Sequence, residues 1–152
     1  MNDFAIIKKN LYKVYDDLKN GKLISKVIID NEDIIVYLNA QEQLYEKGIN
    51  ALGVHISDYM PYKPLTIRIK KMKGQPTDRV TLRDEGDFEK SFYLSVNNKE
   101  FEIKASDWKA EDLVKKYGKD ILGLSEDNKN ELVKSYIIPA ILEQLKDAIN
   151  DR

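Results

Sequence analysis

The sequence predicts an α+β protein in which several helices pack on a small antiparallel β-hairpin, with a long extended arm and a long C-terminal helix. Apolar residues recur at helical spacing near both ends, alternate with polar residues near the middle, and give way in between to a segment rich in proline and lysine. The length of 152 residues favours a single domain. Its expected parts are the helices of 1–52, the arm 53–79, the turn and hairpin 80–106, and the C-terminal helices of 107–152.

The composition sets limits on partners and chemistry. Hydrophobic residues make up 42% of the chain, which is enough for a core, and the formal net charge of -1 gives no global basic field for nucleic acid. A local basic patch remains compatible with that charge. The absence of cysteine excludes disulfides, thiolate metal sites and a cysteine nucleophile, and fits a reducing compartment. No apolar run suits a signal peptide or a membrane span, so we expect no membrane partner.

The first 52 residues predict short helices separated by polar caps. An amphipathic helix is expected over 3–19, with its apolar face directed to the core or to a neighbouring subunit. Segment 22–29 favours a helix, although its β-branched residues also suit a strand. Asn31 and Asn39 are expected to begin two further helices, and Gly48 or Asn50 to end the second. The apolar face of the first helix is Phe4, Ile7, Leu11, Val14, Tyr15 and Leu18.

The arm 53–79 contains Pro61, Pro64 and Pro76, which favour extended backbone and interrupt regular structure. Within it, 65–68 is compatible with a strand or with the start of a helix that runs to Lys73. Three interpretations remain open: a solvated loop, an interface with an acidic partner, or a surface that tracks nucleic-acid phosphates. The candidate interface residues are Tyr59, Tyr62, Lys63, Arg68, Lys70, Lys71, Lys73 and Arg79.

The turn and hairpin follow. Val80 and Leu82 alternate with polar residues as in an extended segment, and 84–87 has turn chemistry. Asp84 can accept amide hydrogen bonds there, and Gly86 permits a positive φ. Strands are expected over 93–96 and 100–105. An isolated hairpin is marginally stable, so it must pack on helices or pair with another strand, including one from another chain. The candidate assembly motif is Asp84, Gly86, Phe88, Ser91 and Phe92.

The C-terminal part predicts two helices. The first spans about 107–118, with Trp108 and Tyr117 on its apolar side and Gly118 at its end. The second spans about 125–149, begins at Ser125 as N-cap, and should kink or restart at Ile138 because Pro139 follows.

No arrangement of residues in the sequence indicates catalysis. His55 is the single histidine, and the carboxylates of 84–87 lack the alternating ligand pattern of a calcium loop. The glycine-containing loops do not match a phosphate-binding loop. We therefore expect no enzyme activity, no cofactor and no metal site.

A short motif resembles a known family. Asp84-Glu85-Gly86-Asp87-Phe88-Glu89-Lys90-Ser91, followed by an aliphatic strand and hairpin, is similar to the D-T-G-x-L-x-x-S motif of head–tail connector and tail-completion proteins of tailed bacteriophages. Tyr117-Gly118 and Pro139-Ala140 match later elements of that family. The longer set of segments QLYEKGI (43–49), KGQPTDRVTLRDEGDFEKSF (73–92) and DILGL (120–124) also looks like small virion proteins from phages and prophages of gut Bacteroidetes. Glu85 and Phe88 replace the usual threonine and leucine of the motif.

The resemblance implies a structural protein of the virion neck or tail, assembled in the host cytoplasm as a dodecameric or hexameric ring. Its partners would be the portal and other neck or tail proteins. The alternative is a phage-encoded regulatory or nucleic-acid-binding protein that uses the basic segment 63–79.

Overall fold

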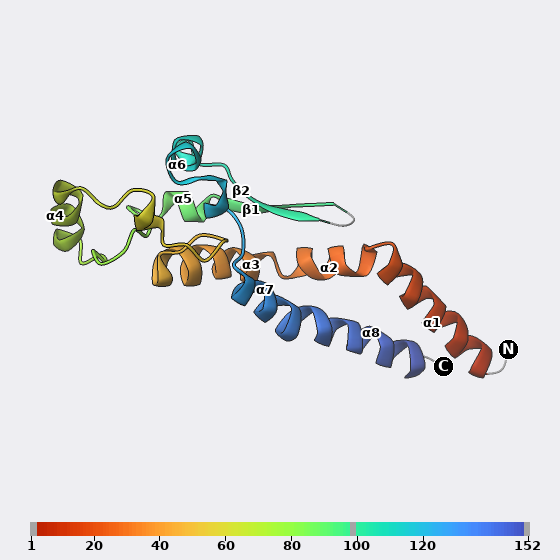
Figure 1. Cartoon of the computed structure of the whole chain (residues 1–152). Coiled ribbons are helices and arrows are strands. Elements are labelled where there is room, and N and C mark those ends of the chain that lie inside the picture. Colours follow the sequence, from red (N-terminus) through yellow and green to blue (C-terminus); the bar gives the residue numbers. More distant parts are fainter. Residues whose placement is uncertain (1–2, 98–99, 151–152) are drawn as a thin grey trace.

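A computed structural model describes residues 3–97 and 100–150. The predicted α+β class is confirmed: helices pack against one side and the base of a single antiparallel hairpin within these ranges, and the last described segment is a long helical one (Figure 1). None of the helices in the described ranges is long and apolar enough to cross a bilayer.

The N-terminal helices are α1 (Asp3–Lys19), α2 (Lys22–Asp30) and α3 (Glu32–Tyr37). The helical interpretation of 22–29 is confirmed. The predicted helix start at Asn39 is wrong, because α3 continues directly into the π-helical segment η1 (Leu38–Lys47). Asn39 is fully buried, and its amide donates instead to the carbonyl groups of Ile121 (3.2 Å) and Gly123 (2.9 Å). Gly48 ends the helix with a φ of 64°, as expected.

The arm 53–79 is not extended throughout. It holds a 3₁₀ turn, η2 (Ile56–Asp58), and the helix α4 (Pro64–Met72). Pro64 stands in the first turn of α4, where the missing amide donor is harmless. Of the two expectations for 65–68, the helix is correct. The arm carries α4 to one end of the molecule, away from the ends of α1 and α8 (Figure 1).

The hairpin follows a single helical turn, α5 (Asp87–Lys90). Strands β1 (Phe92–Val96) and β2 (Phe101–Ala105) pair with Phe92 opposite Ala105. Helices α2 and α3 cover β1, and the Glu32 carboxylate accepts a hydrogen bond from the Leu94 amide (2.8 Å). The hairpin therefore packs on helices, which is one of the two ways that the sequence left open for it. The predicted extended backbone at Leu82 is wrong, because this residue has a φ of 59°, a strained value for a bulky side chain.

The C-terminal part consists of α6 (Ala110–Tyr117), η3 (Lys119–Ile121), α7 (Glu126–Leu132), the π-helical η4 (Val133–Ile137) and α8 (Ile138–Asn150). Ser125 caps α7 as expected, and α8 begins at Ile138 as the proline suggested. The assignment of Trp108 to the apolar side of a helix is wrong. Trp108 precedes α6 and is 79% exposed.

The buried residues form two clusters. The larger joins α3, η1, the hairpin and η3, with Ile35, Leu44, Ile56 and Ile121 fully buried. The smaller lies where α1 and α2 meet α8 and consists of Val14, Leu23, Val27 and Ala148. The expected apolar face of α1 is only partly used, because Phe4 and Tyr15 are exposed.

Candidate assembly interface

The turn motif is built around Gly86, which has a φ of 89° and directly precedes α5. Phe88 and Phe92 are buried and contact each other edge to face, with ring centroids 4.8 Å apart. The Ser91 hydroxyl donates to the Phe88 carbonyl oxygen (2.7 Å) and so closes the turn locally. The structure thus brings four of the five motif residues together in one folded turn.

Asp84 has a different role from the one expected. No described backbone amide donates to its carboxylate; the Lys73 ammonium does, and it also donates to Glu85 (2.7 Å). The hydrogen bond from Lys73 lowers the pKa of Asp84 below its ordinary value, and the same bond raises the pKa of Lys73. Asp84 therefore links the end of the arm to the turn.

Lys70 and Tyr62 also belong to the fold rather than to a free basic surface. The buried Lys70 ammonium donates to the Arg83 carbonyl oxygen (2.6 Å) and to Gln75 Oε1 (2.9 Å), and lies 5.0 Å from the centre of the Tyr62 ring. The Tyr62 hydroxyl accepts from the Thr81 amide (2.9 Å). These contacts hold α4 against the segment that leads into the turn.

Arg79 and Tyr59 have partners within the chain as well. Arg79 Nε donates to the Tyr45 carbonyl oxygen (2.8 Å), and its Nη1 pairs with Asp78. The Tyr59 hydroxyl accepts from the Asn50 amide (3.1 Å). Of the predicted basic set, Lys63, Arg68 and Lys71 are the exposed residues that form no ion pair with any described residue.

Helix α4 turns apolar side chains toward solvent. Leu65 is 68% exposed, Ile69 43% and Met72 81%. Their spacing places them on one face of the helix. Arg68 lies on the same face, and Lys71 lies at its flank, on the side away from Ile69. We call Leu65, Arg68, Ile69, Lys71 and Met72 the α4 stripe. An apolar helix face left in water is typical of a surface that another protein covers.

A groove that the sequence did not predict lies between the helix α3–η1 and the helix α7–η4. It has a volume of about 430 Å³. Its apolar and aromatic residues include Ile34, Tyr37, Leu38 and Tyr136, and its charged residues are Glu42, Lys47, Asp127 and Glu131. We call it the acidic groove. Sequence reasoning missed it because its two walls are about ninety residues apart in the chain.

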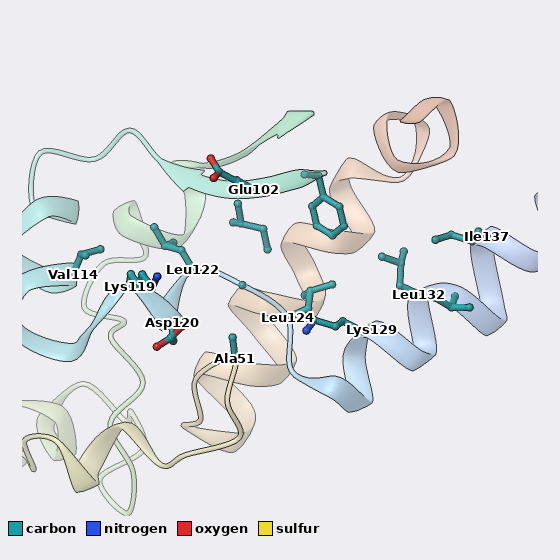
Figure 2. Close-up of a pocket in the computed structure, with 14 residues that line it drawn as sticks. Ala51, Glu102, Val114, Lys119, Asp120, Leu122, Leu124, Lys129, Leu132 and Ile137 are labelled. Carbon is teal, nitrogen blue, oxygen red and sulfur yellow. The ribbon is translucent and has the colours of Figure 1, made fainter. Parts of the chain in front are cut away.

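A larger apolar cavity of about 650 Å³ lies between β2, η3 and the α7–η4 helix (Figure 2). Ile103, Leu122, Leu124 and Leu132 line it, and Glu102 and Asp120 stand at its margin. The strand β2 has no second strand partner within the described ranges. This side of the hairpin therefore has a strand edge that pairs with no other strand of the described ranges, and an apolar cavity beside it.

The described residues form no cluster of metal ligands. No group of three or more His, Asp or Glu side chains in 3–97 and 100–150 is arranged to hold a metal ion. His55 is exposed and contributes its backbone to a bridge with Ile49. What these ranges do offer is surface that suits contact with another protein.

Comparison of the chain with protein-family models, with curated proteins and with solved structures gave no match.

Proposed function

We propose that this protein is a structural component of a tailed-bacteriophage virion, a portal-proximal connector or tail-completion protein that forms a ring in the head–tail neck. The observation that carries the proposal is the exposed α4 stripe, held out on an arm at one end of the molecule. Apolar side chains so placed are stabilised when a neighbouring protein covers them. The sequence motif around Gly86 supplies the neck assignment by resemblance.

The hairpin supports the same proposal. Its β2 edge has no second strand partner in the described ranges, and an apolar cavity lies beside it. An unpaired strand edge can pair with a strand of another chain. Repeated head-to-tail contacts between unlike surfaces close into rings when the rotation between subunits allows it. A connector is expected to carry several such surfaces.

The alternative, nucleic-acid binding through 63–79, has less support. Lys70, Lys73 and Arg79 are engaged within the chain, which leaves Lys63, Arg68 and Lys71 for phosphates. These three cations neighbour exposed apolar side chains, a combination that suits protein contact better than phosphate tracking.

The proposal is tested by mass photometry of the purified full chain, alone and mixed with the portal protein of the same phage. We expect a ring of six or twelve copies, formed alone or on the portal. A protein that stays monomeric and binds neither portal nor tail assemblies would contradict the proposal. Salt-sensitive binding to duplex DNA that is lost in Arg68→Glu/Lys71→Glu, without ring formation, would instead favour the alternative.

A further inference from the structure

We propose that the α4 stripe of one copy docks in the acidic groove of the next copy. The inference rests on the proposed ring and names the two surfaces that would join its subunits. The two surfaces carry opposite charge: exposed cations lie on the stripe, and carboxylates prevail in the groove.

The stripe brings two unpaired cations to the contact. Arg68 and Lys71 are exposed, and neither forms an ion pair with a described residue. Lys70 and Lys73 on the same segment bind Arg83, Asp84 and Glu85 of the same chain. The arm therefore has two cations that bind within the chain, and two others, Arg68 and Lys71, that can pair with carboxylates of another copy. Arg68 and Lys71 are close in sequence to the exposed apolar residues Leu65, Ile69 and Met72.

The groove has the opposite charge. Glu42, Asp127 and Glu131 form no ion pair with a described residue, and Lys47 is the single basic residue in its lining. The Glu131 carboxylate accepts a hydrogen bond from the Ser135 hydroxyl (2.7 Å). Tyr37 is 52% exposed at the edge of the groove and offers an aromatic face to a guanidinium such as that of Arg68.

The geometry suits a helix in a groove. Helix α4 has nine residues, a length of about 13 Å, and the wall formed by α3 and η1 is longer. In helix-in-groove recognition an amphipathic helix lays one face between two other elements. Here Tyr37 and the partly exposed Ile34 and Tyr136 would meet the apolar side chains of α4, and the carboxylates of the groove would meet its cations. Because α4 and the groove are different surfaces, the contact is head-to-tail and repeats from copy to copy.

A disulfide trap tests the contact directly, since the chain has no cysteine of its own. In the double variant Tyr37→Cys/Met72→Cys, mild oxidation should give a ladder of cross-linked oligomers on a non-reducing gel. The matched control is Tyr12→Cys/Met72→Cys, in which the first cysteine stands on the exposed face of α1, outside the groove. No ladder from the first variant, or equal ladders from both, would overturn the inference.

Charge reversal gives an independent test. Arg68→Glu/Lys71→Glu and Glu42→Lys/Glu131→Lys should each weaken self-association at least about tenfold in sedimentation velocity, and the quadruple variant should recover most of the loss. The control Lys9→Glu/Lys13→Glu reverses two exposed cations on α1 and should assemble normally. Recovery in the quadruple variant cannot be explained by misfolding of either parent, and its absence contradicts the pairing.

The two proposals fail in different ways. Rings on the portal without a Tyr37→Cys/Met72→Cys ladder would leave the neck role in place and refute this contact. A ladder without any binding to portal or tail proteins would leave the contact in place and refute the neck role.

Discussion

Gly86 is the residue on which the turn before the hairpin depends. Its φ of 89° lies where a side chain with a Cβ is strained, and a β-branched side chain more so. Gly86→Val should therefore lower the free energy of unfolding by about 2 kcal/mol, measured by urea denaturation. The strain is conformational rather than a collision, since the nearest atom to an added Cβ is Lys90 Cε at 3.6 Å.

The neighbouring Asp87 provides the control for that experiment. Its side chain is exposed, and it forms no hydrogen bond or ion pair through its carboxylate with a described residue. Asp87→Asn should leave the urea midpoint nearly unchanged. Equal stability of both variants would show that Gly86 is not needed for the shape of this turn.

The contact between Asp84 and Lys73 should be visible as a dependence of stability on pH. The pKa of Asp84 is lowered in the folded protein, so its contribution is present above the ordinary value of 3.8 and is lost as the pH falls through the folded pKa. Asp84→Asn should be slightly less stable than the wild type at neutral pH, and the difference should shrink below pH 3.8 and vanish once the pH is below the folded pKa of Asp84. Both side chains are exposed, so the effect is small.

Thermal unfolding across acidic pH measures this effect, and the shift should stay within a few degrees. A difference between Asp84→Asn and wild type that persists unchanged at the lowest pH would mean that the carboxylate charge is not what Lys73 recognises.

At the level of elements, buried amides fasten η1 to the chain after η3. Gln43 is fully buried, donates to the Gly123 carbonyl oxygen (2.8 Å) and accepts from the Ser125 amide (2.7 Å). The side-chain amide of Asn128, on α7, donates to the carbonyl oxygen of Leu38, on η1 (2.8 Å). These bonds also fix the relative position of the helices that form the acidic groove.

Replacing Gln43 with Met should destabilise the protein by about 2 kcal/mol, because the buried Ser125 amide would lose its acceptor. Chemical denaturation followed by circular dichroism measures the change. Asn130→Met, on an exposed position of α7, is the matched control and should be close to neutral. A neutral Gln43→Met would imply that another acceptor replaces the amide.

Most helices and strands could be predicted from the sequence, whereas the contacts between them could not. Helical periodicity located α1, α2 and α8, and the chemistry of Gly86 and Ser125 located a turn and a cap, because these signals are local. Asn39 was misread because caps and buried amides use the same residue type, and only the fold brings Ile121 and Gly123 to it.

The arm shows the same limit. Proline suggested extended backbone, yet Pro64 begins a helix, since a proline is tolerated in the first helical turn. Lys70 and Lys73 looked like free cations because their partners Arg83 and Asp84 are more than ten residues away. No sequence signal separates them from Arg68 and Lys71.

For the molecule as a whole, the division of the buried residues into two clusters predicts uneven stability. The smaller cluster at the α1–α8 end consists of a few partly enclosed aliphatic residues, whereas the larger includes several that are fully buried. Segments with fewer buried contacts open first. Amides of α1 should therefore exchange with solvent hydrogen faster than those of η1.

Hydrogen exchange followed by mass spectrometry measures this order, and Val14→Ala should accelerate exchange in α1 and α8 with little change in η1. Uniform acceleration across the chain would mean that the two clusters unfold as one cooperative unit.

The hydrogen bonds of Lys70, which hold α4 in place within the chain, affect the heat capacity of association. An arm already folded against Arg83 and Gln75 has lost its conformational freedom before any partner arrives. Its docking would then bury surface without folding a segment. Association should show the modest negative heat-capacity change of rigid surfaces meeting, rather than the large one of coupled folding.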